Sequence, residues 1–152
     1  LDRVGHYLTE ASIPFALGLR ADEWTWLHPT EVGGWTVLGL MVAVLVLLNK
    51  AFTDLVHVAR AKTRRPMLED VAESTRSRVS GMAAVRRAFG YVPIFRAFIA
   101  VEATLLALVA GIVDVGRGDV LGTQWLVVIM VPLAVVTAGG HLLGVLTSSR
   151  LD

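Results

Sequence analysis

The chain contains no cysteine. Disulfides, thiolate metal ligands and cysteine nucleophiles are therefore excluded. Charged residues are also scarce, because they make up 18% of the 152 residues, against roughly 25% in soluble domains. Hydrophobic residues make up 55% of the chain, and the mean hydropathy is +0.64. This composition is typical of an integral membrane protein, and the length predicts a single domain over residues 1–152.

The sequence also lacks the motifs of several enzyme classes. It contains no GxxxxGK[ST] phosphate-binding loop, no GxSxG nucleophile motif, no HExxH zinc motif and no EF-hand loop. Basic residues do not alternate with aromatic ones as they do on surfaces that bind single-stranded nucleic acid. We therefore expect no catalytic residues, no metal site and no nucleic-acid partner.

Two long uncharged stretches predict membrane-spanning helices. Residues 120–149 contain no formally charged side chain, and as a helix they would exceed the ~30 Å hydrocarbon core of a bilayer. This stretch predicts a span at about 121–147. Residues 32–49 are also uncharged and predict a span at about 33–57. Its helix is expected to continue to about residue 64, because Pro66 is the first strong break.

A third, weaker apolar stretch follows Pro93 and predicts a span at about 94–113. The short glycine-rich sequence DVGRGD at 114–119 then leads into the last span. A turn this short predicts that the second and third spans form an antiparallel pair. The fold class expected from the sequence is thus an all-α integral membrane protein with three transmembrane helices.

The first 33 residues predict an interfacial segment. Their apolar run at 13–19 is too short to cross a bilayer and contains a proline and a glycine. Indole rings favour the membrane–water interface, and three of them, Trp24, Trp26 and Trp35, cluster at the entrance to the first predicted span. We expect an irregular or interfacial segment on the bilayer surface, and the alternative is an ordinary loop.

Residues 66–89 predict a basic amphipathic helix between two spans. Acidic residues come first and arginines follow, which suits the helix dipole. Such a helix is expected to lie on an anionic lipid surface or against a partner subunit. A solvated connector is the alternative. The residues that would face lipid or a partner are Arg76, Arg78, Arg86 and Arg87.

The distribution of positive charge predicts the orientation. Residues 50–96 hold ten of the fourteen lysines and arginines and only four acidic residues. Basic loops stay on the cytoplasmic side, so the loop at 50–93 and the C-terminus are expected inside and residues 1–33 outside. The composition favours the plasma (inner) membrane of a bacterium or archaeon. Leu1 is not an initiator methionine, and the sequence leaves open whether residues precede it.

Two histidines form a candidate cofactor site. His57 lies about 35 Å along a helix from Gly34, and His141 lies about 30 Å along a helix from Leu121. Both predicted helices run in the same direction, so the two imidazoles are expected at a similar depth. Two imidazoles at matched depth are suited to the axial ligation of a b-type haem. The alternatives are a histidine among lipid headgroups for His57 and plain helix packing around His141.

Glu102 is the one acidic residue inside the predicted second span. It lies ~13 Å past Pro93 along a helix, close to the middle of the membrane. Ionisable residues at that depth are candidates for function by default. We consider proton or cation handling, pairing with a basic residue of a partner, or a neutral carboxyl that is hydrogen-bonded to Thr36, Gln124 or Thr137.

These patterns lead to one main functional expectation and two alternatives. The chain is expected to be a non-catalytic accessory or anchoring subunit of a multi-subunit membrane complex, with lipids and other membrane subunits as partners. The first alternative is a haem-b electron-transfer anchor that uses His57 and His141. The second is a homo-oligomeric proton or cation pathway around Glu102.

Overall fold

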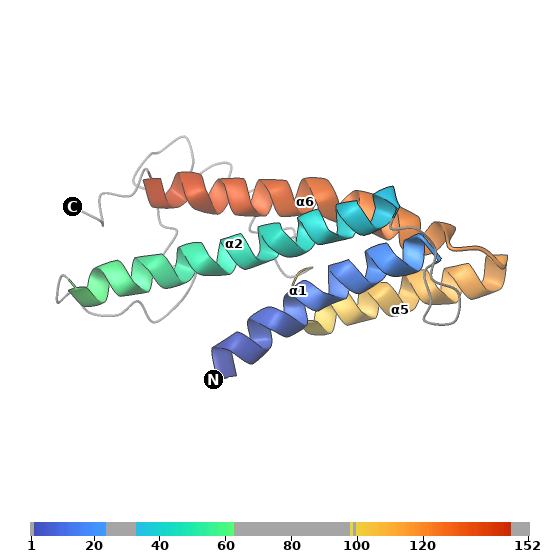
Figure 1. Cartoon of the computed structure of the whole chain (residues 1–152), viewed down its shortest axis with the longest axis horizontal. Coiled ribbons are helices and arrows are strands. Elements are labelled where there is room, and N and C mark those ends of the chain that lie inside the picture. The colour runs from blue at the N-terminus through green and yellow to red at the C-terminus, as the bar shows by residue number, and fades with distance from the viewer. Residues whose placement is uncertain (1, 24–32, 63–97, 99, 147–152) are drawn as a thin grey trace.

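The computed structural model describes residues 2–23, 33–62, 98 and 100–146. These residues form four α-helices and the turns beside them: α1 (Asp2–Ala21), α2 (Gly34–Lys62), α5 (Ala100–Arg117) and α6 (Leu121–Leu146). The helices lie side by side as a bundle, with α1 and α5 running in one direction and α2 and α6 in the other (Figure 1). The described part of the chain is therefore all-helical, as the sequence predicts.

Two of the four helices are long and apolar enough to cross a membrane, at Gly34–Ala59 in α2 and Leu121–Leu143 in α6. The predicted spans at 33–57 and 121–147 correspond to these helices. A third span is not shown, because the described α5 has only 18 residues and three of them are charged, namely Glu102, Asp114 and Arg117. The first part of that predicted span, before Phe98, lies outside the described residues.

The turn between α5 and α6 is shorter than the sequence suggests. Helix α5 continues through Asp114 to Arg117, and Gly118 then adopts a φ of 73°. The N–H of Gly118 donates to the carbonyl of Asp114 at 2.8 Å, which is the usual way for a glycine in the left-handed region to end a helix. Asp119 accepts the N–H of Leu121 at 3.1 Å and caps α6. The two helices are antiparallel, as predicted.

The prediction of an irregular or interfacial segment at 1–33 is wrong for residues 2–21. They form α1, which packs along α2 and also contacts α5 and α6. Glycines explain the close packing, because a Cβ on Gly18 would lie 2.6 Å from the carbonyl oxygen of Trp35. A Cβ on Gly39 would likewise overlap the carbonyl oxygen of Pro14. The run at 13–19 is too short to span, but a helix packed in a bundle needs only one apolar face.

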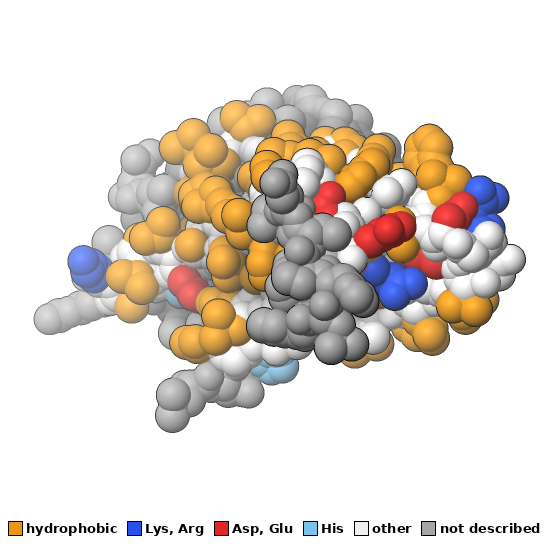
Figure 2. All heavy atoms as spheres, turned by 45° about the vertical axis from the view of Figure 1, so that its right-hand side comes forward, with side chains coloured by type: hydrophobic (Ala, Val, Ile, Leu, Met, Phe, Trp, Pro, Cys, Tyr) orange, Lys and Arg blue, Asp and Glu red, His pale blue; other side chains and the backbone are white. Residues whose placement is uncertain are grey.

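The core of the bundle consists of apolar side chains from α1, α2 and α6 together with Phe98. Its buried members are Leu17, Val42, Val46, Phe98, Val127, Met130 and Ala134. Large apolar side chains are also exposed along the outward faces of α2, α5 and α6. Figure 2 shows patches of hydrophobic side chains on the described surface, while most of the charged side chains in this view lie toward the end where α5 meets α6. Helices that are apolar inside and outside are expected in a lipid environment.

Candidate functional site: an ion pair inside the bundle

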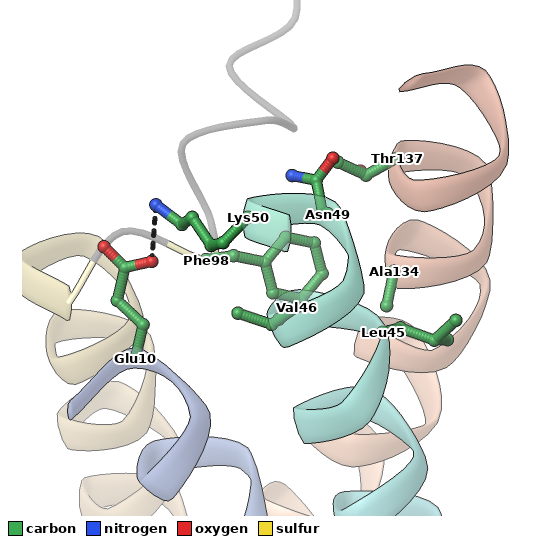
Figure 3. Close-up of a pocket in the computed structure, with 8 residues that line it drawn as sticks. All are labelled: Glu10, Leu45, Val46, Asn49, Lys50, Phe98, Ala134 and Thr137. Atoms are coloured by element: carbon green, nitrogen blue, oxygen red, sulfur yellow. Dashed lines mark ion pairs between the residues drawn. The ribbon is translucent and has the colours of Figure 1, made fainter. Parts of the chain in front are cut away.

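An ion pair between α1 and α2 lies within the bundle. Glu10 of α1 and Lys50 of α2 meet at 2.7 Å between Oε2 and Nζ (Figure 3). The Glu10 side chain is only 7% exposed, whereas that of Lys50 is 31% exposed. Lys50 lies about 21 Å along α2 from Thr36, so the pair is far from the end of the bundle where α2 begins. Charges buried among apolar helices are costly unless they are paired, so this ion pair is a candidate functional site.

A small cavity of about 50 Å³ adjoins the pair. Its polar lining comes from Glu10, Lys50, Asn49 and Thr137, and the remaining lining is apolar and includes Phe98 (Figure 3). The Oδ1 atom of Asn49 is buried and has no hydrogen-bond partner among the described residues. Unpaired buried acceptors are uncommon, and the usual explanation is a water molecule or a ligand.

A second polar contact lies next to the ion pair, closer to the start of α1. The hydroxyl of Tyr7 donates to Oδ2 of Asp54 at 3.0 Å. The Lys50 ammonium group also lies 5.8 Å from the centroid of the Tyr7 ring, which permits a cation–π interaction. Polar contacts between α1 and α2 thus form two successive layers. One face of α1 carries both Tyr7 and Glu10, since they are three residues apart.

A proline one turn along α1 changes the backbone beside Glu10. Pro14 is inside the helix and fully buried. Because proline has no N–H, the carbonyl of Glu10 loses its usual intrahelical donor. The site therefore combines an ionic side chain, an unpaired amide oxygen and a backbone carbonyl without its helical partner.

The opposite end of the bundle carries a different kind of polar contact, which occurs twice. Asp22, just after α1, accepts the N–H groups of Gly33 and Thr36 at 3.0 and 2.8 Å and also the Thr36 hydroxyl. Asp114 of α5 accepts the N–H of Thr123 at 3.1 Å and its hydroxyl. In each helical hairpin, a carboxylate from the first helix thus holds the first turn of the second, where the helix dipole favours an anion.

Arg20 connects the two hairpins. Its Nη2 lies 3.3 Å from Oδ2 of Asp114, and its Nε donates to the Thr123 hydroxyl at 3.2 Å. Asp114 is 2% exposed, so this carboxylate is buried with a complete set of partners. A buried, fully bonded carboxylate at the end of a bundle stabilises helix packing, and we assign this cluster a structural role.

Burial tends to raise the pKa of the Asp22 carboxyl, but the hydrogen bonds from Thr36 and Gly33 outweigh it. They hold the pKa below its ordinary value of 3.8. The carboxylate therefore remains ionised at neutral pH and complements the start of α2.

The structure places the two predicted haem ligands on α2 and α6, which pack against each other. His141 is buried, and the ring of Phe52 lies 6.3 Å from it between centroids. Nδ1 of His57 and Nε2 of His141 are buried without a hydrogen-bond partner in the described part of the chain. Haem ligation by these residues stays a prediction, which an absorption spectrum before and after dithionite would test.

Glu102 lies in the first turn of the described α5 and is partly buried. The polar residues considered as its partners donate elsewhere: Thr36 to Asp22, Gln124 to the carbonyl of Ala21, and Thr137 to the carbonyl of Leu133. Its role in a proton or cation pathway stays a prediction.

The predicted amphipathic helix at 66–89 lies outside the described residues. The same holds for its four candidate residues Arg76, Arg78, Arg86 and Arg87, and for Trp24 and Trp26. The other two tryptophans, Trp35 and Trp125, are in the first turns of α2 and α6. They lie at the same end of the bundle, because α2 and α6 run in the same direction.

Sequence reasoning missed Glu10 and Lys50. Glu10 belongs to the segment that the sequence predicts on the bilayer surface, and Lys50 follows an uncharged run without any nearby sign of a partner. A signal was nevertheless present: Glu10, Pro14, Leu17 and Ala21 have the spacing of one helical face, and all four are buried. An acidic residue within such a stripe indicates a buried carboxylate that needs a partner on the facing helix.

Comparison with known proteins does not assign this arrangement to a family. No protein-family model, no curated protein and no solved structure matches the chain. Its function is therefore argued from its own residues.

Proposed function

We propose that the chain is a non-catalytic, membrane-integral subunit that anchors a multi-subunit membrane complex, with α2, α5 and α6 as its spans. The observation that carries the proposal is an open groove between α1 and α5, with a volume of about 510 Å³. Its lining is apolar apart from Arg20 at one end: Leu17, Ala107, Leu108, Gly111, Ile112 and Val115 complete it.

The floor of the groove suits a neighbouring helix. Ala107 and Gly111 are four residues apart on α5, which is the small-xxx-small spacing that lets helix backbones approach closely in membranes. A Cβ added at Gly111 would meet no atom within 4 Å, so the space above this glycine is open. Leu108 and Ile112 flank it and are 59% and 63% exposed. These features support a transmembrane helix of a partner subunit as the occupant.

A pair of glycine substitutions on α5 tests the proposal. Gly111→Leu fills the groove, and Gly116→Leu makes the same change where α5 also has open space but does not line the groove. Each tagged variant is expressed in the source cells, extracted in a mild detergent and analysed by native mass spectrometry. We expect the original chain and Gly116→Leu to carry a second membrane protein in a fixed ratio, and Gly111→Leu to lose it.

Two results would contradict the proposal. The first is an original chain that is found alone or only with copies of itself. The second is a Gly111→Leu variant that keeps its partner in the same ratio as the Gly116→Leu control.

A further inference from the structure

We infer that the cavity beside Glu10 and Lys50 holds water and forms the closed end of a polar half-channel, which opens only toward the end of the bundle where α2 finishes. Two observations support this inference. The cavity is polar and includes a buried acceptor without a hydrogen bond among the described residues, and the interface between α1 and α2 is polar on one side of the cavity but closely packed on the other. The inference rests on the membrane-spanning arrangement proposed above, but not on a partner subunit.

The cavity meets the requirements for bound water. A water molecule needs about 10–15 Å³ of accessible space and two to four polar partners, and this cavity offers about 50 Å³. Asn49 Oδ1 lacks a donor among the described residues. The Lys50 ammonium group has three N–H donors and lies in ion-pair contact with Glu10, whose Oε2 is buried without a hydrogen bond among the described residues. Water between these groups would supply the donor that the amide oxygen lacks.

One side of the cavity is polar and connects to the surface. Lys50 itself is 31% exposed, although Glu10 is 7% exposed. The next layer toward the start of α1 is the hydrogen bond between Tyr7 and Asp54, and both residues are partly exposed. His57, whose Nδ1 is buried without a described partner, follows on α2 one turn after Asp54. Polar groups thus continue from the cavity toward the end of α2.

The other side of the cavity is closed by the packing of α1 on α2. Gly18 and Gly39 bring the two backbones together, since a Cβ on either would overlap the facing helix. Val42 is 0% exposed, and Leu17 and Val46 are 6% and 5% exposed. Close packing of the described residues thus closes this part of the interface, and the inferred half-channel ends at the cavity.

The other charged groups of the packed helices do not line the cavity. Asp54 is bonded to Tyr7, Glu102 lies in α5, and His141 lies beside Phe52 on α6. The lining contributed by α6 is Ala134 and the Thr137 side chain. Among the described residues, Glu10 and Lys50 are therefore the ionisable groups that would contact water in this cavity.

The cysteine-free chain permits a direct accessibility test. Asn49→Cys places a single thiol in the cavity, and Leu48→Cys places one on the outward face of α2, where Leu48 is 43% exposed. Full-length variants in phospholipid vesicles are treated with Ag⁺ from one side. Remaining thiols are then counted by maleimide labelling after denaturation.

Arg117→Cys and Lys62→Cys report the orientation, because these exposed residues end α5 and α2 at opposite ends of the bundle. We expect Asn49→Cys to react at least tenfold faster than Leu48→Cys, and only from the side that also reaches Lys62→Cys. Thr137→Cys, from the facing helix, should behave like Asn49→Cys and provides the test if the first variant does not fold.

The outcomes separate this inference from the proposed function. A cavity thiol that reacts no faster than Leu48→Cys, or reacts equally from both sides, overturns the half-channel. If Arg117→Cys and Lys62→Cys react from the same side, the membrane-spanning arrangement itself fails. Loss of the partner subunit in the Gly111→Leu experiment has no bearing on either result.

Discussion

The ion pair of Glu10 and Lys50 predicts an unequal response to the loss of either partner. Lys50→Met removes the only described ionic partner of a carboxylate that is 7% exposed. Breaking a buried pair in this way costs about 3 kcal/mol or somewhat more. In Glu10→Gln, the ammonium group that remains is already 31% exposed. We therefore expect a loss of only about 1 kcal/mol, near the value for exposed pairs.

The double variant distinguishes an interaction from two separate effects. With both charges removed, no buried ion is left unpaired, and replacing a buried pair by uncharged groups of similar volume is often close to neutral. We expect Glu10→Gln/Lys50→Met to lose about 1 kcal/mol of unfolding free energy, well below what the two single changes predict together. The coupling energy is then about 3 kcal/mol.

Equilibrium unfolding in mixed micelles of a mild detergent and SDS, followed by far-ultraviolet circular dichroism, measures these differences. The reasoning is refuted if the two single losses simply add in the double variant. It is also refuted if Glu10→Gln is the more harmful change, because the order follows from the greater burial of the carboxylate.

Three further predictions concern the packing and capping contacts. Thr123→Val removes the hydroxyl that donates to the buried Asp114 carboxylate and accepts from Arg20 Nε, and should cost about 2 kcal/mol in the same unfolding assay. Gly39→Ala should cost about 1–3 kcal/mol, because its Cβ overlaps the facing backbone, while Gly140→Ala has open space and should be tolerated. Asp22→Asn should reduce the loss of unfolding free energy that acidification causes. The folded-state pKa of Asp22 lies below 3.8, so its carboxylate contributes stability that is present above pH 3.8 and is lost as the pH falls through the folded-state pKa.

Each of these predictions has its own control. Thr104→Val removes an exposed hydroxyl that bonds only to the carbonyl of Ala100 in its own helix, so it should change the unfolding free energy by less than about 0.5 kcal/mol. Equal losses in Thr104→Val and Thr123→Val would contradict the assigned role of Asp114. Similar effects of alanine at the two glycines would contradict the close approach of α1 and α2. If the unfolding free energy of Asp22→Asn falls with acid pH as steeply as that of the original chain, Asp22 is not the group that titrates.

Local information in the sequence determined which of the long apolar segments are helical, but it did not show that residues 2–21 form a helix. The uncharged runs in α2 and α6 identify the two longest apolar helices, because length and hydropathy are properties of the segment itself. The glycine-rich stretch after Asp114 indicated the antiparallel turn between α5 and α6. The end of α5 was misplaced by four residues, since the capping glycine is Gly118 and a charged residue inside the helix resembles a boundary.

Only the tertiary structure decided what the charged residues do. Glu10 and Lys50 are 40 positions apart, and nothing local to either shows that the helices around them pack face to face. The same is true of Arg20 and Asp114, which lie in different hairpins. A charge in an apolar stripe is stable only if a partner on another helix offsets its burial. The sequence by itself thus determined the apolar helices, and the packing of α1 into the bundle determined where the ion pair lies.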